Sequence, residues 1–430
     1  MSHKIFSYIA ALALAAGATE GQAQTTAYVC DGYDYDAIQI NSRTDIAFST
    51  DQKQVTIGKE TFDMADVDSI IFHEPQYPAI DIVWNGGSAN VTVDSRITGV
   101  SYTVNGGYVT ISSTNTSEEL LYRLSGSSED GGLLLNGSYK LRMDLNGVKL
   151  TSKSGCPMDI ECGKRIEVKL QKGTVNSFCD GANSQVKGAF YTKGHLELKG
   201  KGTLNVTGNA KHALCAGEYL QFKSSCGTIN ILSAVSDGIH CGKGKKTDAE
   251  NSRLIIDGGT INISGAGSDC IDCDDYGSAF INGGSLTLNV SQTDGTGLKC
   301  DSILYMNGGE IQLNVTGNIS QGIRYCYNGY FSGGTIEGTI TGNGAKGIKA
   351  KAAKNTTVVN GGDAHFDGTD VTLTIEGGTN VADQSKCYGI HIDKDLYQTA
   401  GTITLHVNNT EAGGYKAKNT YLTGGSISQD

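Results

Sequence analysis

Proline is almost absent from this sequence of 430 residues, with 3 in total and none after Pro157. Disordered chains are usually rich in proline, and collagen-like chains need it together with glycine at every third position. Both classes of protein are therefore excluded. Because proline has no backbone N–H to donate to a β-ladder, its absence favours a fold that uses nearly every backbone donor.

Positive charge is also scarce. The sequence contains 34 Lys and Arg against 45 Asp and Glu, which gives a net charge of −11. A general nucleic-acid binder needs a surplus of cations to neutralise phosphates, so we expect no nucleic-acid partner. Local basic surfaces remain compatible with this composition.

Long apolar runs are missing beyond the N-terminal segment 1–23. This segment contains a cationic start at His3 and Lys4, an apolar run over 5–16, and small residues at Gly21 and Ala23. This is the pattern of a cleaved signal peptide, and the run is shorter than the roughly 18 residues of a membrane span. We expect an exported protein, secreted, periplasmic or at the cell surface, without membrane insertion and monomeric.

Glycine is abundant, with 59 in total, and it marks an internal repeat. A glycine followed by alternating apolar residues recurs with a period of about 25 residues, which is in the range of solenoid repeats. The intervals after Gly227 and Gly334 are longer, and we interpret them as insertions. The anchors are Gly202, Gly227, Gly259, Gly284, Gly309, Gly334, Gly401 and Gly425.

Two further phrases recur between these anchors. One reads as a short strand, as in Gly297-Leu-Lys-Cys, and the other leads into a double glycine, as in Ile303-Leu-Tyr-Met-Asn-Gly-Gly. Three short strands in about 25 residues leave no room for helices, and stacking such units pairs each strand with its equivalent. The sequence predicts an all-β, right-handed parallel β-helix with three strands per coil, the handedness following from the usual crossover rule.

The region before the repeats differs in composition. Residues 24–78 are rich in Tyr and Asp, alternate in hydropathy over 62–72, and end near Pro75 and Pro78. We predict a small N-terminal β-rich module that serves as a leader or a cap, because an open end of a solenoid exposes unpaired strand edges. The parallel β-helix is then expected to occupy residues 79–430.

Alternation in the second phrase predicts two rows of side chains. Cys241, Cys273 and Cys300 point inward, where we favour a buried row of free thiols over disulfides or a metal site. The residues between the inward positions face outward. They are His240, Asp272, Lys299, Arg324, Lys349, His391 and Lys416.

Six of these residues are candidate carbohydrate-binding residues: His240, Lys299, Arg324, Lys349, His391 and Lys416. A column with about one cation per coil suits a linear polyanion that lies along the axis. The alternative is a solvated face that only keeps the solenoid soluble. On another strand, an outward row that includes Asn205, Asn230 and Asn262 offers amides either to sugar hydroxyls or to one another.

An acidic cluster lies beside the cationic column. Asp237, Asp269, Asp272 and Asp274 come from consecutive coils and are the candidate metal ligands, with calcium as the expected ion because hard cations prefer several carboxylate oxygens. Asp275, Asp294 and Asp301 belong to the same cluster. The alternative is that these residues form turns by accepting hydrogen bonds from their own backbone.

Several phrases resemble a known family. Tyr122-Arg-Leu-Ser-Gly, Asp144-Leu-Asn-Gly-Val, Leu198-Lys-Gly-Lys-Gly-Thr-Leu-Asn-Val and Ser236-Asp-Gly-Ile are similar, in order and spacing, to the carbohydrate-binding β-helix family typified by a clostridial surface protein. The resemblance covers about 105–430. It implies a pectate-lyase-like fold, binding of cellulose and acidic pectin, and calcium. The leader resembles the N-terminal stretch of secreted proteins of gut Bacteroidota.

The family often places paired acids before Gly-Ile, and this sequence departs from that pattern. Asp237 keeps one acid and Asp269 precedes Cys270, whereas later coils have Thr296, Gln321 and Lys346 at this position. Calcium is therefore expected only at the earlier coils.

Three functions are consistent with these observations. The first is a non-catalytic exported protein that binds a plant-type, acidic, polygalacturonate-like polysaccharide with the help of calcium. The second is a calcium-dependent polyuronate (pectate) lyase, in which Asp272, Lys299 and Arg324 provide the acid–base groups. The third is a structural or adhesive surface solenoid.

Overall fold

A computed structural model describes residues 25–31, 34–41, 44–73, 75, 77–242, 249–274, 276–351 and 361–430. The predicted signal peptide and Asp275 lie outside these ranges. The chain forms two compact units that divide between Pro78 and Ala79.

The first unit consists of short antiparallel strands. β1 pairs with β2 and β6, and β4 pairs with β3 and β5, around a small core that includes Val55 and Ile57. A role for this unit as a cap stays a prediction. Its elements are β1 (Thr25–Asp31), β2 (Asp34–Ile40), β3 (Ile46–Phe48), β4 (Gln54–Ile57), β5 (Glu60–Asp63), the 3-10 helix η1 (Met64–Asp66) and β6 (Ser69–Ile71).

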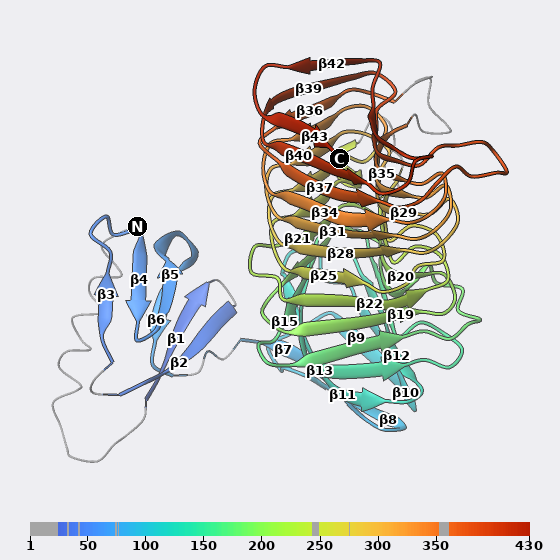
Figure 1. The fold of residues 1–430 in the computed structure, drawn as a ribbon. Helices are drawn as coiled ribbons and strands as arrows, with labels where there is room; N and C mark the ends of the chain where they lie inside the picture. Colours follow the sequence, from blue (N-terminus) through green and yellow to red (C-terminus); the bar gives the residue numbers. More distant parts are fainter. Residues whose placement is uncertain are drawn as a thin grey trace. The chain divides into compact units, whose positions relative to one another are not determined.

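The second unit begins with two antiparallel pairs and continues with parallel strands (Figure 1). One sheet contains 13 strands. They are β9 (Val100–Asn105), β10 (Gly107–Ser113), β12 (Gly131–Gly137), β14 (Met158–Cys162), β17 (Gly188–Thr192), β20 (His212–Ala216), β23 (Ile239–Cys241), β26 (Ile271–Cys273), β29 (Thr296–Cys300), β32 (Gln321–Tyr325), β35 (Lys346–Ala350), β38 (Tyr388–His391) and β41 (Gly413–Lys416).

A second sheet contains 24 strands and consists of two parallel ladders that are joined at their N-terminal end. The first, called the β39 ladder here, contains β8 (Ser88–Val93), β7 (Ala79–Asn85), β11 (Leu120–Ser128), β13 (Leu141–Thr151), β15 (Ile166–Leu170), β18 (Leu196–Lys199), β21 (Leu220–Phe222), β24 (Leu254–Ile256), β27 (Ala279–Ile281), β30 (Leu304–Met306), β33 (Gly329–Phe331), β36 (Ala364–Asp367), β39 (Asp395–Ala400) and β42 (Asn419–Leu422).

The other is called the β40 ladder. It starts from the end of β13 and contains β16 (Val175–Cys179), β19 (Thr203–Gly208), β22 (Thr228–Ala234), β25 (Thr260–Ile263), β28 (Ser285–Val290), β31 (Glu310–Val315), β34 (Thr335–Ile340), β37 (Asp370–Ile375), β40 (Thr402–Val407) and β43 (Ser426–Gln429). A 3-10 helix, η2 (Ala249–Ser252), precedes β24.

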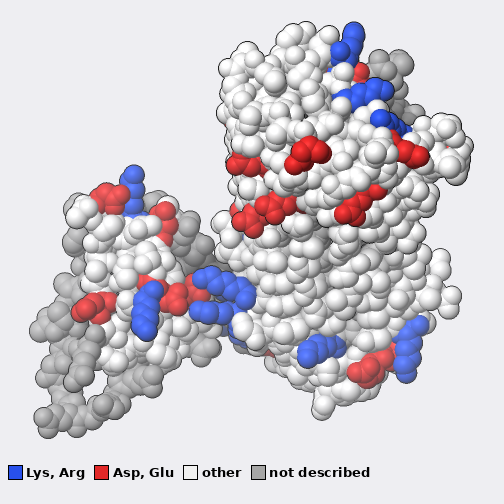
Figure 2. Space-filling view, viewed as in Figure 1, with Lys and Arg blue, Asp and Glu red and all other residues white. Residues whose placement is uncertain are grey.

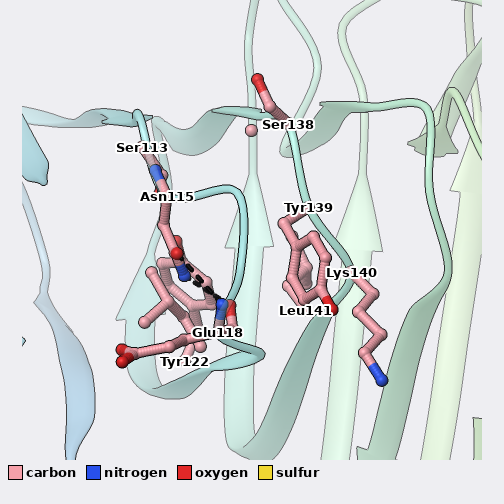
Figure 3. A pocket seen from close by; sticks show the side chains of 10 residues that line it. Ser113, Asn115, Glu118, Tyr122, Ser138, Tyr139, Lys140 and Leu141 are labelled. Carbon is pink, nitrogen blue, oxygen red and sulfur yellow. Dashed lines mark hydrogen bonds between the residues drawn. The ribbon is translucent and has the colours of Figure 1, made fainter.

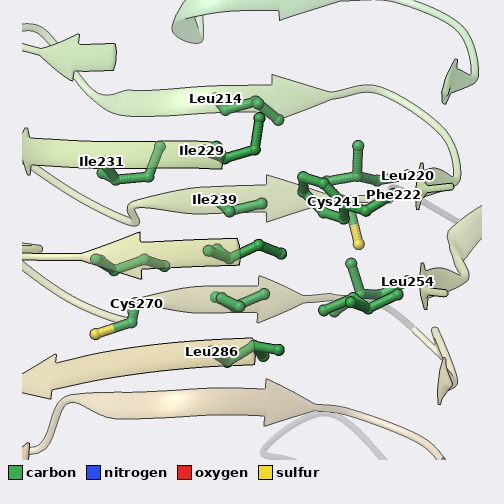
Figure 4. Close-up of a cluster of buried hydrophobic side chains, with 14 of the residues drawn as sticks. Leu214, Leu220, Phe222, Ile229, Ile231, Ile239, Cys241, Leu254, Cys270 and Leu286 are labelled. Carbon is green, nitrogen blue, oxygen red and sulfur yellow. The ribbon is translucent and has the colours of Figure 1, made fainter. Parts of the chain in front are cut away.

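From β14 onward each strand pairs in parallel with the strand three places later in the chain. We call the stretch of chain between two such partners a coil. Alternate residues point inward and build one continuous apolar core, of which Figure 4 shows Leu214, Ile229, Ile239 and Leu254. The described residues contain no α-helix, so the prediction of an all-β chain is confirmed there.

The double glycines form corners between the β39 and β40 ladders. Gly284 has a φ of +83°, and a Cβ at this position would lie 2.8 Å from the carbonyl oxygen of Gly259 in the coil before. Both the left-handed backbone and the close stacking therefore require glycine. The same conditions at successive corners explain why the repeat is recognisable in the sequence.

The long interval between Gly334 and Gly401 contains one additional complete coil. β36 and β37 lie in this interval and pair with β33 and β34, whereas an insertion alone was predicted. The prediction failed because the corner before β37 is built with Gly368 and Thr369 instead of a double glycine.

No helix in the described ranges is both long and apolar enough to cross a bilayer.

Candidate functional site

The structure places the outward residues of the 13-stranded sheet in a single row, as the repeat spacing predicts. Asp272 lies between His240 and Lys299, and the remaining members follow at successive strands. We call this set the polar row: His240, Asp272, Lys299, Arg324, Lys349, His391 and Lys416. On its inner side Cys241, Cys273 and Cys300 are buried free thiols, as predicted.

The expectation that the cations of this row face solvent is wrong for its central part. The side chains of Lys299 and Arg324 are 16% and 11% exposed, and Lys349 is 9% exposed overall. Carboxylates contact all three cations: Asp301 lies close to Lys299 and Arg324, and Asp393 pairs with Lys349. The acidic cluster and the cationic column therefore form one mixed network.

Lys299 lies at the centre of this network. Its Nζ is 2.9 Å from Asp272 Oδ1, 3.8 Å from Asp269 Oδ2 and 3.8 Å from Asp274 Oδ1. Burial lowers the pKa of Lys299, but Asp272 and Asp301 outweigh it, so the pKa lies above its usual value. Lys299 is therefore a fixed cation.

Two histidines hold the other end of the network. Nδ1 of His212 and Nδ1 of His240 each lie 3.1 Å from Asp237 Oδ2, and the two imidazole rings stack with centroids 4.3 Å apart. Burial lowers the pKa of His240, but Asp237 and Asp272 outweigh it and raise the pKa to about 9. His240 is thus protonated at neutral pH and pairs with these carboxylates.

Two of the predicted metal ligands also support the backbone of the next coil. Asp237 Oδ1 accepts a hydrogen bond from the N–H of Asp269 (3.3 Å), and Asp269 Oδ1 accepts one from the N–H of Thr296 (2.8 Å). These contacts join neighbouring coils and differ from the local turns that the sequence left open as the alternative.

The predicted calcium ligands do come together, but they do not fit calcium in this arrangement. Asp237, Asp269 and Asp272 offer carboxylate oxygens within 4.8 Å of one another. The ammonium group of Lys299 already contacts Asp269, Asp272 and Asp274, and Asp237 pairs with two histidines. A divalent cation would add further positive charge where cations already neutralise the carboxylates.

Asp269 provides a test of this network through stability. Burial, followed by repulsion from Asp272, raises the pKa of Asp269 from 3.8 to about 6. Because the pKa of Asp269 is higher in the folded than in the unfolded state, its carboxyl stabilises the fold fully below the unfolded pKa. This stabilisation is lost as the pH rises through 6. At neutral pH the loss in the free energy of unfolding is about 3 kcal/mol. We expect Asp269→Asn to raise the melting temperature at pH 8 and to show little gain at pH 4.

The matched control is Asp370→Asn, which removes an exposed carboxyl. Thermal unfolding followed by circular dichroism from pH 4 to pH 8 measures the effect. A variant that is less stable than the wild type at pH 8 would show that the negative charge of Asp269 is needed.

The C-terminal coils carry an excess of basic groups. Lys346, Lys349, Lys351, His391 and Lys416 act on one another electrostatically, and we call them the cation cluster. Burial and repulsion from neighbouring lysines lower the pKa of Lys346, and they also lower that of Lys349 although Asp393 opposes them. The same two causes lower the pKa of His391 to about 4.

The cation cluster is also visible on the surface. Lys416 is exposed, and Lys346, Lys351 and His391 are half-buried. Figure 2 shows several Lys and Arg side chains at the upper right of the second unit. Among the described residues, Asp393 pairs with Lys349 and lies 3.8 Å from His391, and Asp383 acts on Lys346.

The amide row on the β40 ladder is satisfied within the protein. The Nδ2 of Asn230 donates to Asn205 (2.8 Å), and the Nδ2 of Asn262 donates to Asn230 (3.0 Å). These amides therefore bond one another along the ladder. A pocket near the N-terminal coils, lined by Tyr122 and Tyr139 (Figure 3), has a volume of about 10 Å³, which is room for a single water.

The sequence reasoning missed an aromatic row on the outside of the β39 ladder. Neighbouring rings stack with centroids 4.9–5.3 Å apart and with interplanar angles of 4–15°. Phe280, Tyr305 and Tyr330 recur at the same interval as the corner glycines, and this regularity is a signal that could have revealed the row. The aromatic row consists of Phe280, Tyr305, Tyr330, His365, Tyr397 and Tyr421.

Comparisons with known proteins point to a family that binds carbohydrates. A model of the family described as "Carbohydrate-binding domain-containing protein" matches residues 105–429. Among solved structures, the chain is similar to the polysaccharide lyase-like protein from C. thermocellum, solved as a gadolinium derivative. The identity is 18% and the TM-score 0.42, over 72% of this chain and 99% of that chain. No curated protein matches this sequence.

Proposed function

Because this chain belongs to the family of carbohydrate-binding domain-containing proteins, we propose that it is a non-catalytic protein that binds an acidic polysaccharide at the cation cluster. The binding residues are Lys346, Lys351, His391 and Lys416. Lys349 lies beneath them and pairs with Asp393.

The observation that carries this proposal is the register of strands β35, β38 and β41, which pairs Lys349 with His391 and His391 with Lys416. The lowered pKa values of Lys346, Lys349 and His391 all include repulsion from neighbouring lysines. A carboxylate of the ligand would relieve this repulsion, because opposite charges stabilise the protonated forms. A polyuronate of the polygalacturonate type provides carboxylates at regular intervals, which suits cations supplied by successive strands β35, β38 and β41.

The remaining cations of the polar row have a different role in this proposal. His240, Lys299 and Arg324 are neutralised by carboxylates of the protein, so they stabilise the fold and do not bind the glycan. Binding is then independent of calcium, since the carboxylates that would hold the ion are already paired.

The lyase alternative requires a base that abstracts a proton, and its candidates Asp272, Lys299 and Arg324 already pair within the protein: Asp272 with Lys299 and His240, and Arg324 with Asp301. The pKa of Lys299 is raised, so its amine is not free to accept a proton. His391 is neutral at pH 7, but a pKa of about 4 makes it a weak base. A binding protein is therefore favoured over an enzyme.

We also propose that the coils wind in a right-handed sense with three strands in each. The pairing of strands from β14 onward with the strand three places later supports the number, and the general preference for right-handed crossovers supports the handedness. We further propose that the protein is exported across a membrane, which the signal-peptide pattern of residues 1–23 supports.

Electrophoresis of the whole chain through gels that contain polygalacturonate tests the proposal. We expect retardation by polygalacturonate that is unchanged by a chelator, and no rise in the ultraviolet absorbance of unsaturated uronates when polymer and calcium are mixed with the protein. Loss of retardation with chelator would require a calcium site, and a rise in absorbance would identify a lyase. No retardation on any acidic glycan would favour a structural or adhesive role.

A further inference from the structure

Two histidines and one aspartate form a compact cluster where the polar row begins. The cluster consists of His212, Asp237 and His240, and each of them offers one ligand atom within 4.8 Å of the others. Two of these atoms are imidazole nitrogens. Imidazole suits zinc, copper, iron and nickel, whereas calcium takes oxygen ligands, so the chemistry of this cluster differs from that of the neighbouring carboxylates.

The main chain of two successive coils brings these side chains together. β20 begins with His212, and the N–H of Ala213 donates to the carbonyl oxygen of Asp237 in the next coil (3.3 Å). Asp237 lies three residues before His240, ahead of β23, and the chain bends at Gly238 between them. A Cβ on Gly238 would lie 2.7 Å from a carbonyl oxygen of the following coil, so this bend requires glycine. The side chains of one coil thus meet His212 of the coil before.

The three ligand atoms lie at separations close to those that a zinc ion needs. Nδ1 of His212 and Nδ1 of His240 are each 3.1 Å from Asp237 Oδ2. Two ligand atoms bound to one tetrahedral zinc ion lie about 3.3 Å apart, since each is about 2.0 Å from the metal. The imidazole planes are inclined by 19°, and a further tilt of the rings aims both nitrogens at a common point. Small side-chain movements are therefore enough to admit the ion.

The contacts of His212 favour a cation between its nitrogen and the carboxylate. Nδ1 of His212 accepts a hydrogen bond from the N–H of Asp237 (3.3 Å), which requires a lone pair on this nitrogen. The same nitrogen lies 3.1 Å from Asp237 Oδ2, where a hydrogen bond would require a proton on it. One nitrogen cannot satisfy both contacts. A metal ion accepts a lone pair from Nδ1 and another from Oδ2, so it makes the contact between them favourable.

Neighbouring groups hold the carboxylate ligand and leave a coordination position for solvent. Asp237 Oδ1 accepts a hydrogen bond from the N–H of Asp269, which fixes the orientation of this side chain. Lys299 Nζ lies 2.9 Å and 3.1 Å from the two oxygens of Asp272. A water molecule or a small ligand can then take the fourth position of a tetrahedral ion. The half-buried His240 opens the cluster to solvent.

The charge requirement of this cluster differs from that of the calcium site that the sequence predicts. Calcium needs several carboxylate oxygens, which Lys299 occupies, whereas zinc needs only Asp237 beside the two imidazoles. Lys211 acts on one of the imidazoles and repels a metal ion, and the carboxylates of Asp269 and Asp272 offset this repulsion. A ligating imidazole nitrogen carries no proton, so the ion takes the place of a proton on the cluster.

We propose that His212, Asp237 and His240 bind a divalent transition-metal ion, zinc in the first place, which joins the coils that contain β20 and β23. This site is separate from the cation cluster on β35, β38 and β41, and its ligand is of a different class from the proposed polysaccharide. Because two successive coils supply the ligands, the ion binds the folded chain and stabilises it against unfolding.

Calorimetric titration of the whole chain, made without a histidine tag, tests the proposal together with thermal unfolding followed by circular dichroism. We expect one zinc ion per chain and a rise in melting temperature that calcium and magnesium do not produce. The double variant His212→Gln, His240→Gln should bind zinc at least about tenfold more weakly and lose this rise. Cobalt(II) should give the wild type the visible absorption of a tetrahedral site, and zinc should remove it.

The matched control is His406→Gln, which removes a histidine that is 41% exposed and pairs with Asp430. The double variant keeps every cysteine, so zinc held by thiols would leave its affinity unchanged. Circular dichroism without metal shows whether this variant is folded, and the single variant His240→Gln, which keeps the buried His212, provides the comparison if it is not. A wild type that zinc neither binds nor stabilises, a folded histidine variant of equal affinity, or an equal rise with calcium would overturn the proposal.

Discussion

Neutralising three lysines of the cation cluster, by Lys346→Gln, Lys351→Gln and Lys416→Gln, is expected to weaken binding of polygalacturonate about a hundredfold or more. Lys416 is exposed and Lys346 and Lys351 are half-buried, so a ligand can reach all three from solvent. A hydrogen bond to a charged group contributes about 1.5–3 kcal/mol, so the loss of three is a large part of any glycan affinity. Isothermal titration calorimetry at low salt measures the change.

The matched control removes the same amount of charge elsewhere. Lys149, Lys153 and Lys164 are exposed and lie in N-terminal coils of the second unit. Their triple Gln variant has the same net charge as the cluster variant, so it separates a local site from long-range attraction. Equal affinities of the two variants would show that the cation cluster is not the binding site.

Lys299→Ala is expected to lower the free energy of unfolding by about 3–5 kcal/mol at pH 7. The change leaves Asp269, Asp272 and Asp301 without the ammonium group that they share. Unpaired buried carboxylates become protonated more readily. The difference in the free energy of unfolding between variant and wild type should therefore become smaller as pH falls from 7 toward 5. Chemical denaturation at several pH values measures it, with Lys149→Ala as the control for loss of an exposed lysine.

The same variant tests why calcium does not fit the wild type. Without Lys299, Asp269, Asp272 and Asp274 lose the ammonium group that they share, and calcium ions should restore part of the lost melting temperature. The wild type should not respond to calcium. A similar rise in both proteins would mean that the ion binds despite Lys299.

Much of this architecture could be predicted because the corners dictate the sequence. Positive φ and close stacking at positions such as Gly284 repeat every coil, and the residues between the corners inherit a fixed register. This register correctly placed Lys299, Arg324 and Lys349 in one row. The coil that contains β37 was not predicted, because its corner has Gly368 and Thr369 in place of a double glycine.

The electrostatics could not be predicted in the same way. Asp301 and Asp393 each lie two residues beyond a member of the polar row, and only the path of the chain after the strand brings their carboxylates back to Lys299 and Lys349. Alternation predicts from which face of the sheet a side chain projects, but it does not predict where the charged group at the end of that side chain lies. The aromatic row could have been predicted, because its spacing is as regular as that of the cations.

Strand register in the 13-stranded sheet does not depend on the length of the connections. Ile239 pairs with Ile271 across a lengthened coil as regularly as Leu298 pairs with Ile323 across a coil of the basic repeat length. The 3-10 helix η2 follows β23 in the longer coil, and the pairing of β23 with β26 keeps its register. Natural variants of this scaffold can therefore gain or lose whole segments at the borders of the polar row without repacking the core. Changes in ligand specificity made in this way need not lower the stability of the fold.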